Sequence, residues 1–152
     1  MKRAVLALSL AALSAMPAAA QAPMSWSAID TDSGAMLVFG PTGADDGILT
    51  FTCDKGNPNA LISSRIGSKG LKPDEAARIL LSAGKVKKEF SGKAVTEAGS
   101  SAVEVDAGGK LADIRAVLAG GKSMTLEVKG AKQPVNLTGA LDAFAAFEAS
   151  CQ

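Results

Sequence analysis

The sequence predicts a mostly β (α+β) fold, an antiparallel sheet or sandwich of roughly seven to nine short strands, with a short helix near 110–119 and a C-terminal helix near 139–150. Short segments in which apolar and polar residues alternate recur along the chain, and turn sequences rich in glycine, proline, asparagine or aspartate separate them. Two segments in the second half instead have apolar residues three and four positions apart, which is typical of helices.

The first four expected strands follow one another in the N-terminal half. They are MSWSAI, GAMLVFG, GILTFTCD and NALISSRI, at residues 24–29, 34–40, 47–54 and 59–66. In the third, Leu49, Phe51 and Cys53 alternate with more polar residues, so they share one side of the strand. Cys53 is therefore expected to face the core.

Residues 73–84 have two interpretations. Pro73, Asp74 and Glu75 resemble the first turn of a helix, with Gly84 as its C-terminal cap. The overlapping segment RILLSAGKVKKEF also resembles a hairpin that turns at Ala83 and Gly84. We favour the strand interpretation.

The second half adds three strands and the two helices. The strands are SAVEVDA, SMTLEVKG and QPVNLT, and the first helix, KLADIRAVLAGG, stops at its paired glycines. In the last helix, Leu141, Phe144, Phe147 and Cys151 have spacings of three, three and four and fall on one face.

The N-terminus has the pattern of a secretory signal peptide. Lys2 and Arg3 precede an apolar run and then small residues in two A-x-A arrangements, which predicts cleavage after Ala20 or Ala22. The apolar run is shorter than the roughly 20 residues needed to span a bilayer. The expected products are a signal peptide at 1–22 and a single periplasmic or secreted domain at 23–152, with no transmembrane segment.

Export would place both cysteines in an oxidising compartment, where disulfides persist. Two cysteines allow one intramolecular pairing, and both are expected on core-facing sides. We therefore predict a Cys53–Cys151 disulfide that fastens the last helix to a central strand.

The tail, AVLAGGKSMTLEVKGAKQPVNLTGALDAFAAFEASCQ, combines a helix, a short V-x-L-T-G strand, an A-L-x-x-F helix and a terminal cysteine. With W-S-A-I-D and I-L-T-F-T-C in the front half, it resembles small exported bacterial proteins of unassigned activity. It is similar in layout to the invasion-associated locus B family. The resemblance implies an extracytoplasmic, mostly β domain and carries over no catalytic residue.

Composition narrows the possible chemistry. The chain has no histidine and no tyrosine, which excludes Ser-His-Asp and Cys-His catalysis and histidine-ligated metals. Removing residues 1–22 takes away two of 16 basic residues and none of 15 acidic residues, so the net charge becomes −1. We expect no nucleic-acid partner, no metal, no cofactor and no catalytic residue.

Several fragments match only part of a functional motif. Asp30 to Gly34 begins like a calcium loop but lacks its later ligands, and Asp45 and Asp46 fit a turn better than a carboxylate pair. Ser82 and Lys85 match the S-x-x-K of serine enzymes without the accompanying motifs.

Two features suggest contact with a partner. Lys85, Lys87 and Lys93 are expected on one face of a strand, where they could contact an anionic polymer or form a solvated surface. Trp26 is a candidate contact if exposed and otherwise a core residue. We expect a non-catalytic binding protein for an unknown envelope or extracellular partner. The alternatives are a small hydrolase that uses carboxylates or a Ser-Lys pair, and a purely structural envelope protein.

Overall fold

The computed structural model describes residues 22–97 and 101–152. The predicted signal peptide falls almost entirely on residues 1–21, outside the described residues. Within the described ranges, no helix is long and apolar enough to cross a membrane.

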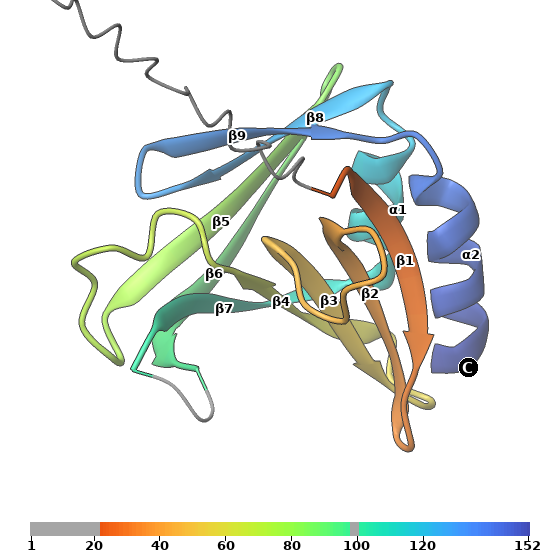
Figure 1. Ribbon diagram of the computed structural model, residues 1–152, viewed down its shortest axis with the longest axis horizontal. Coiled ribbons are helices and arrows are strands. Elements are labelled where there is room, and N and C mark those ends of the chain that lie inside the picture. Colours follow the sequence, from red (N-terminus) through yellow and green to blue (C-terminus); the bar gives the residue numbers. More distant parts are fainter. Residues whose placement is uncertain (1–21, 98–100) are drawn as a thin grey trace, which may run out of the picture.

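The described chain forms one antiparallel sheet of nine strands and two helices, which confirms the mostly β expectation (Figure 1). The elements are β1 (Met24–Asp30), β2 (Gly34–Pro41), β3 (Leu49–Asp54), β4 (Asn59–Ser64), β5 (Ala76–Ala83), β6 (Val86–Thr96), β7 (Val103–Lys110), α1 (Leu111–Leu118), β8 (Ser123–Val128), β9 (Ala131–Asn136) and α2 (Ala140–Cys151). Their order across the sheet is β1-β2-β3-β4-β7-β6-β5-β8-β9.

The ambiguous segment at 73–84 contains a strand. β5 pairs with β6 from Ala76 to Ala83, so the hairpin interpretation is confirmed. Asp74 adopts a left-handed backbone conformation with φ of 66°, which is incompatible with the first turn of a helix. Its N–H donates to the carbonyl oxygen of Ala94, and thus the segment already approaches β6 before β5 begins.

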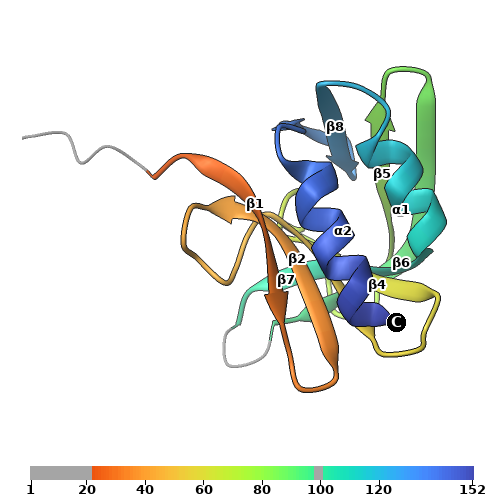
Figure 2. The same cartoon turned by 90° about the vertical axis from the view of Figure 1, so that its right-hand side faces the viewer.

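The sheet curls until its two edge strands, β1 and β9, come together at one end. The indole N–H of Trp26 on β1 donates to the carbonyl oxygen of Asn136 on β9 at 2.7 Å. The helices pack on the inner side of this curl, with α2 lying against β1 and β2 (Figure 2). Alternate strand residues point inward onto them, including Leu37, Phe51, Ile62, Ile79, Leu81 and Leu126, all with no exposed surface.

The predicted disulfide is present. Cys53 on β3 and Cys151 at the end of α2 are bonded, with Cα atoms 5.7 Å apart and a sequence separation of 98. The N–H of Gly56 also donates to the carbonyl oxygen of Cys151 at 2.7 Å, which gives the helix end a second attachment. The disulfide suggests an oxidising compartment.

The prediction that Leu141 lies on the buried face of α2 is wrong. Leu141 is 47% exposed, and Ala140 is buried in its place with Phe144, Phe147 and Cys151. Positions 140, 144, 147 and 151 have spacings of four, three and four, which fit a helical stripe as well as the expected set does. Ala140 is therefore part of the buried stripe, and Leu141 lies beside it with nearly half of its surface exposed.

Candidate functional site

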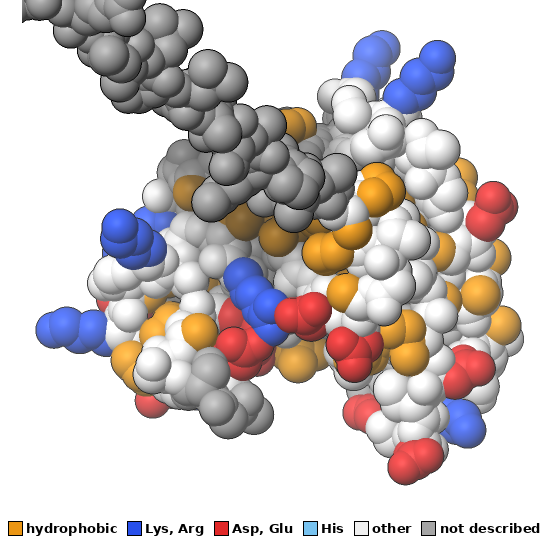
Figure 3. Space-filling model, in the orientation of Figure 1, with side chains coloured by type: hydrophobic (Ala, Val, Ile, Leu, Met, Phe, Trp, Pro, Cys, Tyr) orange, Lys and Arg blue, Asp and Glu red, His pale blue; other side chains and the backbone are white. Residues whose placement is uncertain are grey.

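A polar hollow of about 190 Å³ lies on the outer face of the sheet, over β2, β3 and β4 and beside β7. It is lined by Met36, Asp45, Asp46, Gly47, Thr50, Ser63, Arg65, Glu97 and Glu104. Figure 3 shows basic and acidic side chains gathered in the middle of this face. We call these residues, together with Asp106, the acidic hollow.

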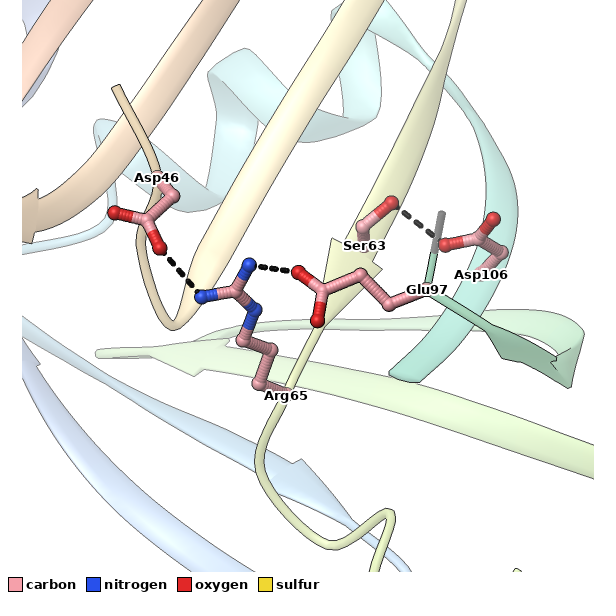
Figure 4. Close-up of polar contacts among 5 residues, drawn as sticks. All are labelled: Asp46, Ser63, Arg65, Glu97 and Asp106. Carbon is pink, nitrogen blue, oxygen red and sulfur yellow. Dashed lines mark hydrogen bonds and ion pairs between the residues drawn. The ribbon is translucent and has the colours of Figure 1, made fainter. Parts of the chain in front are cut away.

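Strand alternation supplies the floor of the acidic hollow. Leu49, Phe51 and Ile62 point inward and are fully buried, so the residues between them point outward. The register then places Thr50 opposite Ser63, and Ser63 opposite Asp106. The hydroxyl of Ser63 donates to Asp106 Oδ1 at 2.6 Å (Figure 4).

The loop between β2 and β3 supplies one wall because it folds tightly back onto the sheet. The N–H of Ile48 donates to the carbonyl oxygen of Phe39 at 3.0 Å. A Cβ on Gly47 would lie 2.2 Å from that oxygen, so the close approach requires glycine at this position. The fold of this loop holds Asp46 over the outer face.

Arg65, directly after β4, links the β2–β3 loop on one side of the acidic hollow to the segment after β6 on the other (Figure 4). One guanidinium nitrogen donates to Asp46 Oδ2 at 2.7 Å, and the other donates to Glu97 Oε1. Asp46 comes from the β2–β3 loop, and Glu97 follows β6. The guanidinium therefore holds two segments together that are 51 residues apart in sequence.

The charges in the acidic hollow do not balance. Arg65 is the one cation among its described residues, against five carboxyl groups, from Asp45, Asp46, Glu97, Glu104 and Asp106. Partial burial raises the pKa of Glu104, and the neighbouring charges of Asp106 and Glu97 raise it further. Arg65 opposes this rise only weakly, since its donors are directed to other carboxylates.

Two of the three predicted contact lysines share a face, because Lys87 and Lys93 are both exposed on β6 and lie an even number of positions apart. Lys85 lies in the turn between β5 and β6 and is not part of the strand, because β6 begins at Val86. Lys93 is bound to Asp74 Oδ1 at 2.5 Å. It also lies six residues, or about 20 Å along an extended strand, from Lys87.

Trp26 belongs to the packed fold. Its half-buried ring lies 5.1 Å from the ring of Phe39 and 6.3 Å from that of Phe51, measured between centroids. With its hydrogen bond to Asn136, the side chain joins the core to the far edge of the sheet. These contacts within the protein give Trp26 a structural role in the fold.

The other singled-out fragments form no reactive cluster. Asp30 accepts a hydrogen bond from Ser150 of α2 at 2.7 Å, and Ser82 lies across from Lys87 on β6 with no hydrogen bond to Lys85. Among the described residues, no group of three or more aspartates, glutamates or cysteines is placed to hold a metal ion.

Sequence reasoning missed the central part of this site. Glu104 and Asp106 alternate with Val103, Val105 and Ala107 in the predicted strand, and that pattern could have placed both carboxyl groups on one outer face. Nothing local to Arg65 indicated its partners.

No known family, curated protein or solved structure matches the chain. The similarity in layout to the invasion-associated locus B family therefore stays a prediction.

Proposed function

We propose that this is a non-catalytic periplasmic or secreted binding protein, and that its acidic hollow receives a cationic group of an envelope or extracellular partner. The disulfide supports the compartment, because disulfides persist where the environment is oxidising. The excess of carboxyl groups in the acidic hollow supports a partner that carries a positive charge.

The observation that carries the proposal is the environment of Glu104. Partial burial and two neighbouring carboxyl groups disfavour the ionised form of Glu104, which is why its pKa is raised. An ammonium or guanidinium group from a partner would supply the missing positive charge and donate hydrogen bonds to the same oxygens. Perturbed groups of this kind gather at functional sites.

The geometry favours binding over catalysis. Ser63 donates its hydroxyl hydrogen to the Asp106 carboxylate, and the chain has no histidine that could act as the general base for a serine nucleophile. Asp46 and Glu97 both accept hydrogen bonds from the Arg65 guanidinium, so these carboxylates are already engaged in binding a side chain. The described site thus offers charge and hydrogen-bond acceptors without an assembled nucleophile and base.

A binding experiment with simple probes tests the proposal. Capped tetra-arginine and tetra-glutamate peptides would be titrated into the mature protein at low salt, with affinity followed by calorimetry and the location by NMR shifts. We expect tetra-arginine alone to bind and to shift the amides of Arg65, Glu97 and Glu104. Glu104→Gln/Asp106→Asn should weaken that binding about tenfold, since losing one charge-assisted contact costs about 1.5 kcal/mol or more.

The matched control is Asp32→Asn/Asp142→Asn, which makes the same change in net charge at exposed acids outside the acidic hollow. It should retain most of the affinity. Equal losses in both variants, or no binding by the wild type, would contradict the proposal. Substrate turnover that disappears in a folded Glu104→Gln variant would favour the carboxylate hydrolase instead.

A further inference from the structure

Two turns meet at the end of the sheet away from the acidic hollow. One is Gly84–Lys85 between β5 and β6, and the other is Gly120–Gly121 between α1 and β8. A Cβ on Gly84 would lie 2.4 Å from the carbonyl oxygen of Gly120, and one on Gly120 would lie 2.6 Å from that of Ala83. Because glycines form this contact, the two backbones touch with no side chain between them.

The contact brings together lysines that are distant in sequence. Lys85 directly follows Gly84, Lys122 is the second residue after Gly120, and Lys87 is the second residue of β6. We call these three residues the lysine corner. All three are exposed, and none forms an ion pair with any described residue. Figure 3 shows basic side chains projecting at this end of the molecule. The acid nearest along the same face of β6, Glu89, is paired with Arg78 at 3.0 Å.

Hydroxyl groups lie next to the lysine corner. Ser82 is directly opposite Lys87, and Thr125 is directly opposite Ser82 on the next strand. Lysines and hydroxyls of this kind donate to phosphate oxygens. The row therefore presents donors suited to a phosphate-bearing surface.

We propose that the lysine corner docks the protein on an anionic phospholipid surface. Its three lysines project from turns and a strand end, and none of them lines a described cavity. A small anion would need a concave site to surround it, whereas a projecting group of lysines can contact many headgroups of a flat bilayer at once. The near-neutral net charge does not oppose this contact, because the acidic hollow lies at the other end of β6.

Vesicle sedimentation tests the docking. The mature protein would be mixed at low salt with vesicles of phosphatidylcholine alone or with 40% phosphatidylglycerol, a composition chosen to give a strong negative surface potential. Each lysine near such a surface strengthens binding about fivefold. Lys85→Gln/Lys87→Gln/Lys122→Gln should therefore lower the partition coefficient on anionic vesicles about 100-fold. Binding by the wild type should also fall steeply as salt rises.

The matched control is Lys55→Gln/Lys69→Gln/Lys110→Gln, which removes three exposed lysines elsewhere and gives the same net charge. The partition coefficient of this control on anionic vesicles should fall less than threefold, and thermal melting should confirm that both variants fold. Equal losses in the two variants would overturn the proposal, as would wild-type binding that is the same on neutral vesicles. Binding to soluble polyphosphate without binding to anionic vesicles would also overturn it. The peptide experiment on the acidic hollow does not depend on any of these results.

Discussion

Removing the disulfide should destabilise the protein mainly through the unfolded chain. Cys53 and Cys151 are 98 positions apart, and closing a loop of about 100 residues is worth about 4.7 kcal/mol in chain entropy. Measured losses are commonly 2–5 kcal/mol, so we expect Cys53→Ala/Cys151→Ala to lose about 3–4 kcal/mol. Alanine is the appropriate replacement because both sites are buried and alanine places no new polar group there.

The assay is equilibrium unfolding in urea. With a slope of about 2 kcal/mol per molar urea, the midpoint should fall by roughly 1.5–2 M. The folded state should change little, since Phe144 and Phe147 still hold α2 and the Gly56 N–H still reaches the helix end. The near-UV circular dichroism of Trp26 reports that packing. A loss below about 1 kcal/mol, or a variant without that signal before unfolding, would refute the reasoning.

Three further predictions concern single residues. Trp26→Phe should keep the ring packing but lose the hydrogen bond to Asn136, which costs about 1 kcal/mol in urea unfolding; an unchanged midpoint would mean that this bond does not hold the sheet edges together. Gly84→Ala should cost at least about 1 kcal/mol more than Gly43→Ala, because both have positive φ but only Gly84 would place a Cβ 2.4 Å from a carbonyl oxygen; equal costs would contradict the close contact of the turns. The pKa of Glu104 is raised above its ordinary 4.5 in the folded protein, so its contribution to stability is lost as pH rises through the folded value. Glu104→Gln should then unfold at a higher urea concentration than the wild type near pH 7 and at about the same concentration near pH 4; a lower midpoint at pH 7 would show that the charge is compensated.

Alternation along the strands was sufficient to predict much of the fold. It placed Leu49, Phe51 and Cys53 inward, and the presence of only two cysteines then predicted the Cys53–Cys151 bond. Alternation reports which side of a strand a residue faces and not which strand lies beside it, so the pairing of β4 with β7 had no local signal. Leu141 was misplaced because spacings of three and four fit two adjacent helical stripes.

The acidic hollow depends on the same non-local information. Asp46 is 19 residues from Arg65, and Glu97 is 32 residues from it. Their meeting requires both the tight β2–β3 loop and the pairing order of the sheet. The lysine corner is similar, because Lys122 joins Lys85 only through contact between two glycine turns. Side chains that meet through loops and turns carry no period that a sequence pattern could reveal.

The lysine corner and the acidic hollow are held a fixed distance apart because β6 extends from one to the other. Lys87 is near its start, and Glu97 directly follows its end. The 11 residues of β6 span about 35 Å at the rise of an extended strand. At physiological salt the Debye length is about 8 Å, so the two surfaces are electrostatically independent of each other. With the lysine corner on a bilayer, the acidic hollow would lie at the far end of β6 from the anionic headgroups that would compete for a cationic partner. A near-neutral protein can therefore be attracted to an anionic surface and bind a cationic partner at the same time, because its opposite charges are held apart by the length of one strand.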